Sequence, residues 1–175
     1  MTPEDKNDIL KLLTKYEKTF IDLERYDEGR IETCTDADEK AVHIDLQEAQ
    51  LVITELKTKA TNHVFFGKEK VQGAFKAILE GVHQSFGGKD IYPSIEDKAV
   101  NLFYLIIKNH PFSDGNKRIG SAMFLLFLDK NKKLDTVSLD SDKLAALALL
   151  LAESPPSQKD NVIDFVTRSV FGTGS

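Results

Sequence analysis

Apolar residues recur along most of the chain at the spacing of one helical face, and polar residues or helix breakers separate these segments. The clearest such face consists of Ala99, Leu102, Phe103, Ile106 and His110. Pro111 disfavours helical geometry in the residue before it, so the sequence predicts a helix that stops at His110 and leaves the imidazole exposed at a corner. Residues 119–128 are apolar nearly all round, which is typical of a helix buried on most sides.

The same periodicity predicts five further helices. They cover approximately residues 2–29, 42–56, 75–86, 144–152 and 162–170.

Capping residues mark several of these helix ends. Gly87-Gly88 is expected to stop the third of these helices, Asp140 and Ser141 to cap the fourth, and Ser94 with Asp97 to cap the helix that leads to His110. No glycine-rich turn is flanked by the alternation that a sheet needs. The sequence therefore predicts an all-α fold.

Composition limits the remaining possibilities. A chain of 175 residues with 41% hydrophobic content is expected to form one domain with a substantial core, or a domain with a helical extension. The net charge of −5 argues against a general nucleic-acid binder. Cys34 is the only cysteine, which excludes an intrachain disulfide and a cysteine-based zinc cluster. No segment is long and apolar enough to cross a bilayer, and no basic start precedes an apolar stretch, so we expect a cytoplasmic protein without a membrane partner.

The candidate chemistry is concentrated in the run from His110 to Gly120. His110 is suited to accept a proton from a hydroxyl, because the unperturbed pKa of imidazole lies close to neutral pH. Asp114 is predicted to cap the following helix and to hold a Mg²⁺ ion through one carboxylate, with water and phosphate oxygens as most of the other ligands.

The start of the following helix is predicted to bind phosphate. Gly115, Asn116 and Lys117 would present unpaired backbone N–H groups there, and the side chains of Lys117 and Arg118 add positive charge. The phosphates of a nucleotide fit such a site. A base beside a nucleotide indicates transfer of a phosphate-containing group onto an alcohol.

The run resembles the signature of the Fic/Doc (Fido) family, His-Pro-Phe-x-Asp/Glu-Gly-Asn-Gly/Lys-Arg, and fills every fixed position from His110 through Arg118. A wider stretch, Phe66–Asp129 and Leu144–Glu153, is similar to RhuM-like and death-on-curing Fic proteins, notably over residues 87–96. The resemblance implies an all-α Fic-type helical bundle with a short β-hairpin flap before the motif helices. The helices predicted within residues 1–60 are expected to form an N-terminal extension that packs on the Fic domain, residues 61–175, or on a partner.

The resemblance implies a role for each residue of the motif. His110 is the general base, Asp114 is the Mg²⁺ ligand, and Phe112 is a buried anchor of the loop. The nucleotide phosphates contact Gly115, Asn116, Lys117 and Arg118.

The resemblance also implies a flap that docks the target. It is expected near residues 62–67, where Phe65, Phe66 and Gly67 would pair with a target strand through main-chain hydrogen bonds.

The function implied is transfer of AMP from ATP, with Mg²⁺, onto a Ser, Thr or Tyr hydroxyl of a target protein. A Doc-like kinase that transfers the γ-phosphate is the first alternative, since Lys117 stands where most AMP-transferring members have glycine. A non-catalytic module that binds nucleotide or a partner is the second, since Ser121 replaces an arginine found in many members.

Regulation by a separate protein is also expected. Many Fic proteins carry an inhibitory helix of the pattern Ser/Thr-x-x-x-Glu-Gly/Asn. Thr35–Glu39 has the spacing but is followed by Lys40, so the sequence favours a toxin-like protein that is inhibited by an antitoxin-like partner. His43, His63 and His83 have no companion carboxylates at ligand spacing and are expected to be ordinary histidines.

Overall fold

A computed structural model describes residues 40–61 and 64–172. These residues fall into two compact units, 40–137 and 138–172. The predicted helix over residues 2–29, the segment Thr35–Glu39 and His63 lie outside the described residues. The boundary expected between residues 60 and 61 stays a prediction.

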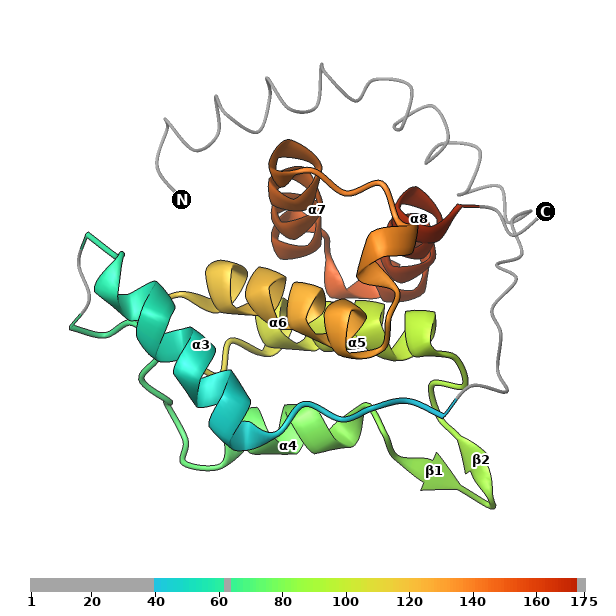
Figure 1. The fold of residues 1–175 in the computed structure, drawn as a ribbon, viewed down its shortest axis with the longest axis horizontal. Helices are drawn as coiled ribbons and strands as arrows, with labels where there is room; N and C mark the ends of the chain where they lie inside the picture. The colour runs from blue at the N-terminus through green and yellow to red at the C-terminus, as the bar shows by residue number, and fades with distance from the viewer. Residues whose placement is uncertain (1–39, 62–63, 173–175) are drawn as a thin grey trace. The chain divides into compact units, whose positions relative to one another are not determined.

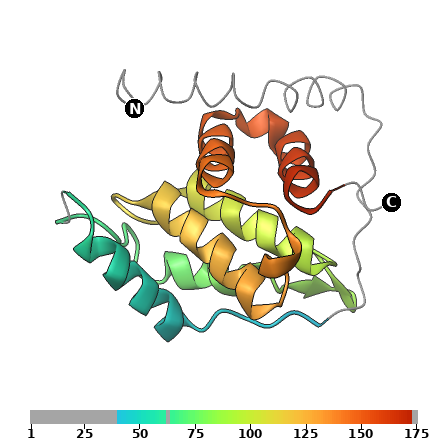
Figure 2. The same ribbon diagram turned by 45° about the horizontal axis from the view of Figure 1, so that its top comes forward.

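The first unit is built on two long helices that lie side by side (Figures 1 and 2). They are α5 (Ile95–Asn109) and α6 (Asn116–Lys130). The helix α3 (Leu46–Thr58) packs on α6, and α4 (Ala74–Gly81) packs on α5. A 3₁₀ turn, η1 (Leu134–Thr136), follows α6 and contacts it. The all-α fold class is therefore confirmed.

The interface between α5 and α6 forms the centre of the core. The rings of Phe103 and Phe124 stack with centroids 4.7 Å apart, and both side chains are fully buried. Gly120 allows the two backbones to approach, because a Cβ there would lie 3.1 Å from the side chain of Ile107. This close packing gives the loop between α5 and α6 two rigid ends.

Polar contacts attach the segment before α3 to α6. The Asn131 side chain accepts a hydrogen bond from the Val42 N–H (2.6 Å) and donates one to the Val42 carbonyl (3.0 Å). Glu48, in the first turn of α3, pairs with Lys130 at 2.6 Å, and this hydrogen bond lowers the pKa of Glu48. The side chain of Asp45 caps α3.

The helix predicted from Phe75 to Phe86 is too long. In the structure α4 ends at Gly81, and a hairpin of β1 (Ser85–Phe86) and β2 (Lys89–Asp90) follows. Gly87 and Gly88 have φ of 60° and 80°, as a two-residue hairpin turn requires, so they turn a strand and not a helix end. Phe86 is accordingly 86% exposed instead of buried. The expectation that no glycine turn joins paired strands was wrong for this short segment.

A buried lysine fixes the hairpin to α5. Lys98 is 3% exposed, and its ammonium group donates to the Asp90 carboxylate at 2.9 Å and to the Tyr92 carbonyl. Ser94 caps α5 by accepting a hydrogen bond from the Asp97 N–H at 2.9 Å, as the sequence predicted.

The second unit contains α7 (Ser141–Glu153), the 3₁₀ turn η2 (Pro156–Gln158) and α8 (Lys159–Phe171), and α7 contacts α8. Asp140 caps α7 through the Lys143 N–H at 2.7 Å, which confirms the predicted cap. The Lys143 ammonium donates to the carbonyls of Ser138 and Ser169, and burial lowers the pKa of Lys143.

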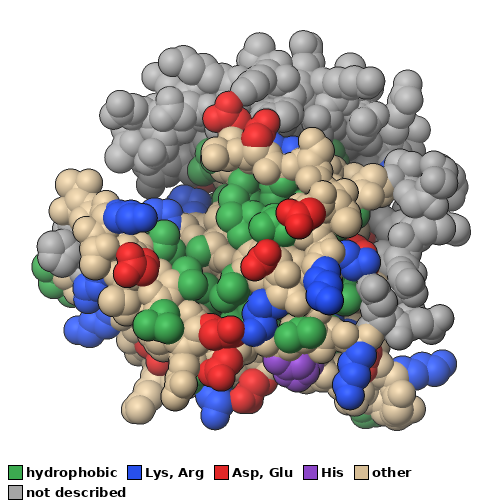
Figure 3. All heavy atoms as spheres, in the orientation of Figure 1, with side chains coloured by type: hydrophobic (Ala, Val, Ile, Leu, Met, Phe, Trp, Pro, Cys, Tyr) green, Lys and Arg blue, Asp and Glu red, His purple; other side chains and the backbone are tan. Residues whose placement is uncertain are grey.

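Acidic and basic side chains are intermixed over the described part of the face drawn in Figure 3. Within residues 40–61 and 64–172, no helix has the length and apolar character needed to cross a membrane.

Two of the histidines form a stacked pair. The rings of His43 and His83 lie 3.4 Å apart between centroids and 7° from parallel. Burial, followed by the nearby positive charges of His43 and Lys98, lowers the pKa of His83 to about 4. His83 therefore stays neutral in the folded protein where an unfolded histidine would already be protonated.

This pair predicts a specific acid sensitivity. Because the pKa of His83 is lower in the folded state than in the unfolded state, the free energy of unfolding should fall as pH drops from 6.5 towards 4. We expect His83 to account for about 1–2 kcal/mol of the loss between pH 7 and pH 5. Urea unfolding of His83→Gln should show a loss smaller by that amount. Equal losses of unfolding free energy in the unmodified protein and in His83→Gln would contradict the lowered pKa of His83. Between pH 7 and pH 8, the unfolding free energies of the two proteins should change in parallel.

Candidate active site

Residues 110–115 of the motif form the loop that joins α5 to α6. His110 follows the last residue of α5 in a left-handed conformation, with φ of 49° and ψ of 60°, and its side chain is exposed. Pro111 and Phe112 turn inward and are buried. The predicted helix end at His110 is therefore confirmed. The left-handed backbone of a non-glycine residue costs about 1–2 kcal/mol, so other contacts must hold this loop.

Asn116 supplies two of these contacts. Its side-chain oxygen accepts a hydrogen bond from the Phe112 N–H at 3.0 Å, and its amide donates to the Phe112 carbonyl at 2.8 Å. The Phe112 ring is fully buried and packs on Phe75 with centroids 4.9 Å apart. The first residue of α6 thus clamps the middle of the loop from the inside.

The segment 66–70 holds the loop from its other side. The Gly67 N–H donates to the Asp114 carbonyl (3.1 Å), the Ser113 N–H to the Lys68 carbonyl (2.8 Å), and the Lys70 N–H to the Pro111 carbonyl (2.9 Å). Phe66 pairs with Asp114 and Glu69 with Phe112 as isolated β-bridges. Three main-chain hydrogen bonds therefore fix the backbone beside His110.

The helix α6 begins one residue later than the sequence predicts. Gly115, with φ of 92°, is the N-cap, and Asp114 does not cap the helix. Residue 115 must be glycine for two reasons. Its positive φ disfavours other residues, and a Cβ there would lie 2.5 Å from the ring of Phe66. No side chain caps the first turn, so the N–H groups of Asn116, Lys117 and Arg118 lack the intrahelical acceptors that later residues have.

The charged side chains at this helix start are accessible. Asp114 and Arg118 form a loose ion pair at 3.5 Å, and their side chains are 45% and 51% exposed. Lys117 is also exposed. Uncapped N–H groups with two cations suit a polyphosphate.

A metal ion would depend on Asp114 at this site. Within the described part of the chain, no three His, Cys, Asp or Glu side chains are grouped closely enough to hold a metal. One carboxylate beside a phosphate site fits Mg²⁺, which keeps several water ligands and takes others from substrate phosphates.

The surroundings of His110 favour its neutral form. Although the side chain is accessible, its partial burial lowers the pKa of His110, and the positive charges of Lys70, Lys117 and Lys108 lower it further. A neutral imidazole at physiological pH is ready to accept a proton. Lys70 is a site residue that sequence reasoning missed, since it lies forty residues upstream and only the pairing with Pro111 brings it near.

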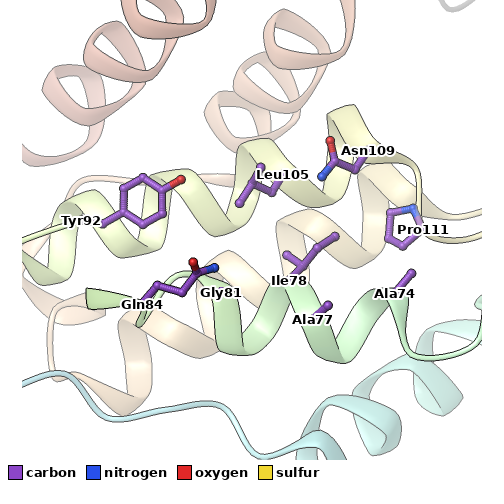
Figure 4. A pocket seen from close by; sticks show the side chains of 9 residues that line it. All are labelled: Ala74, Ala77, Ile78, Gly81, Gln84, Tyr92, Leu105, Asn109 and Pro111. Carbon is purple, nitrogen blue, oxygen red and sulfur yellow. The ribbon is translucent and has the colours of Figure 1, made fainter. Parts of the chain in front are cut away.

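A groove of about 490 Å³ lies between α4 and α5 (Figure 4). At one end it is lined by Asn109 and Pro111, the two residues that flank His110. The α4 side is made of small residues, Ala74, Ala77 and Gly81, with Ile78 among them. Tyr92, in the segment before α5, lines the opposite end of the groove (Figure 4). Burial raises the pKa of its phenol.

The other residues named from the sequence lie as follows. Phe65 is 54% exposed, Phe66 is 1% exposed, and Gly67 has φ of 71°. In this segment the Gly67 N–H is directed to the motif loop, and docking of a target strand here stays a prediction. The hydroxyl of Ser121 donates to the Lys117 carbonyl at 2.8 Å.

The loop, its histidine and the uncapped helix start agree with the arrangement expected from the motif. A family model described as the Fic/DOC family matches residues 34–128, which is more than half of the chain, so the chain belongs to the Fic/DOC family. Members of this family are generally transferases. The similarity to RhuM-like proteins within the family stays a prediction. No curated protein and no solved structure matches the chain.

The clamp made by Asn116 can be tested by its removal. Asn116→Ala leaves the buried N–H and carbonyl of Phe112 without partners, so the free energy of unfolding should fall by about 1–3 kcal/mol. Urea unfolding measures this change. Ser113→Ala is the matched control, because the exposed Ser113 side chain lies in the same loop and should change stability by less than about 0.5 kcal/mol. Equal effects of the two substitutions would show that the clamp does not hold the loop.

The charge of Lys70 should contribute to the pKa of His110. Because the ammonium group lowers the pKa of His110, Lys70→Gln should raise that pKa, and NMR titration of the His110 ring should show the midpoint at higher pH. Lys76→Gln is the control, since Lys76 pairs with Glu80 on α4 and does not contribute to the pKa of His110. An unchanged His110 midpoint in Lys70→Gln would contradict the prediction.

Proposed function

We propose that this protein transfers AMP from ATP onto a Ser, Thr or Tyr hydroxyl of a target protein. The observation that carries the proposal is the position of a histidine, whose pKa is held low, six residues before the uncapped start of α6 and its accessible cations. The family membership supports a transferase. The groove between α4 and α5, which is lined by the two residues that flank His110, offers space for residues of a target chain.

In the proposed reaction, His110 removes the proton from the acceptor hydroxyl. The hydroxyl oxygen forms a bond to the α-phosphorus of ATP, and the bond from that phosphorus to the bridging oxygen breaks, so pyrophosphate leaves. The N–H groups of residues 116–118 and the Arg118 guanidinium hold the phosphates during this exchange. Mg²⁺ bound by Asp114 would neutralise phosphate charge.

A Doc-like kinase is the second candidate, and Lys117 is the residue that favours it. Its charge acts on His110 from the start of α6, where most AMP-transferring members have glycine. If the ATP is reversed in the site, the hydroxyl attacks the γ-phosphorus and ADP leaves. The non-catalytic module remains the third candidate, because Ser121 replaces an arginine that many members use.

We further propose a toxin-like protein that acts in the cytoplasm and is controlled by a separate inhibitory protein. The support is the sequence alone, in which a complete catalytic pattern occurs without a good copy of the inhibitory one.

Labelled ATP distinguishes the candidates. The purified chain is incubated with Mg²⁺, a cell lysate and ATP carrying the label on either the α- or the γ-phosphate. AMP transfer predicts that protein acquires α-label, and His110→Ala should lower the rate by at least about 100-fold, because the base is lost.

Label from the γ-phosphate alone would establish the kinase instead. ATP binding by calorimetry without any His110-dependent label on protein would contradict both reactions and support the non-catalytic module. His43→Ala is the control for loss of a histidine outside the motif and should retain labelling.

A further inference from the structure

We propose that Phe66 is a positioning residue of the phosphate site, which acts by holding the guanidinium of Arg118 over its ring. The inference rests on the proposed binding of a nucleotide at this helix start. Phe66 lies outside the motif, fifty-two positions before Arg118, and the sequence assigned it to a flap that docks the target.

The contact between the two side chains is direct. The central carbon of the Arg118 guanidinium lies 4.6 Å from the centroid of the Phe66 ring, within the range of a cation–π interaction. Phe66 is 1% exposed, so packing fixes the ring, whereas the Arg118 side chain is 51% exposed and can move. The fixed ring of Phe66 therefore restricts the positions that the Arg118 guanidinium can take.

The ion-pair partner of Arg118, Asp114, holds the guanidinium less firmly. The ion pair is long, at 3.5 Å, and Asp114 is itself half exposed. Exposed ion pairs of this kind restrict a side chain only weakly. Asp114 is also the proposed Mg²⁺ ligand, and a bound ion would compete with Arg118 for its carboxylate. The ring of Phe66 can then keep the guanidinium near the helix start.

The same ring shapes the backbone of the site. A Cβ on Gly115 would lie 2.5 and 2.7 Å from two atoms of the Phe66 ring, so the ring lies against the helix cap. Phe66 also pairs with Asp114 as a β-bridge, and the next residue, Gly67, donates its N–H to the Asp114 carbonyl at 3.1 Å. One buried residue thus contacts or neighbours the metal ligand, the N-cap and the phosphate-binding cation.

The first test measures the position of Arg118 without nucleotide. A proton above an aromatic ring is shifted upfield, so the Nε–H signal of Arg118 should be shifted in the unmodified protein and should move towards the random-coil position in Phe66→Leu. The chain has four arginines, and Arg118→Lys assigns the signal by its loss. Phe103→Leu is the control, because it makes the same change in the core between α5 and α6 and should leave the signal in place.

The second test measures binding of Mg²⁺-ATP by calorimetry in a double-mutant cycle. Phe66→Leu should weaken binding about fivefold, as expected from loss of one cation–π interaction. In the Arg118→Ala background the same substitution should change binding less than about twofold, because its effect passes through Arg118. A purely structural role would weaken binding equally in both backgrounds. If thermal unfolding shows that Phe66→Leu does not fold, Phe66→Met replaces it, since the flexible methionine fills the space without a ring.

The outcomes separate this inference from the proposed function. ATP binding that is equally tight in the unmodified protein, Phe66→Leu and Phe103→Leu would overturn the role of Phe66 and leave the function standing. A shifted Arg118 signal in a protein that binds no ATP would support the positioning of Arg118 and contradict the proposed function. An Arg118 signal unaffected by Phe66→Leu would overturn the inference directly.

Discussion

The loop that carries the candidate base depends on main-chain hydrogen bonds from a segment forty residues away. Residues 66–70 donate to or accept from Pro111, Ser113 and Asp114, and these bonds replace the regular structure that the loop lacks. They add to the Asn116 hydrogen bonds and to the packing of Phe112 on Phe75, and together these contacts hold the strained backbone of His110. The segment before α4 is therefore part of the site, although none of its residues belongs to the motif.

The order of the site follows from rigid surroundings. Phe103 and Phe124 lock α5 against α6, and the side chain of Asn116 ties the first residue of α6 back to Phe112. The base and the helix start are thus held at a fixed separation before any substrate arrives. Such preorganisation reduces the entropy that a transfer reaction must lose when its partners are brought together. The charged groups of Asp114 and Arg118, in contrast, remain accessible to a ligand.

Local signals in the sequence predicted the helices and the helix end at His110, because Pro111 and the capping residues act on their immediate neighbours. The end of α4 was predicted wrongly, since Gly87-Gly88 suits a helix stop and a hairpin turn equally well by residue type. Asp114 was expected as the N-cap, and the choice of Gly115 depends on the ring of Phe66, which is distant in sequence. The stack of His43 on His83 and the effect of Lys70 on His110 also depend on contacts between residues that are distant in sequence. Contacts between distant segments leave no periodicity or spacing that a single sequence can show.

The central claim is that a nucleotide's phosphates bind the uncapped start of α6 beside His110. A crystal structure of the chain with Mg²⁺ and a non-hydrolysable ATP analogue tests it most directly. The account predicts phosphate oxygens within hydrogen-bond distance of the N–H groups of residues 116–118, one phosphorus on the side of the His110 imidazole, and Mg²⁺ on Asp114. Nucleotide bound elsewhere on the protein, with the start of α6 left to water, would contradict it.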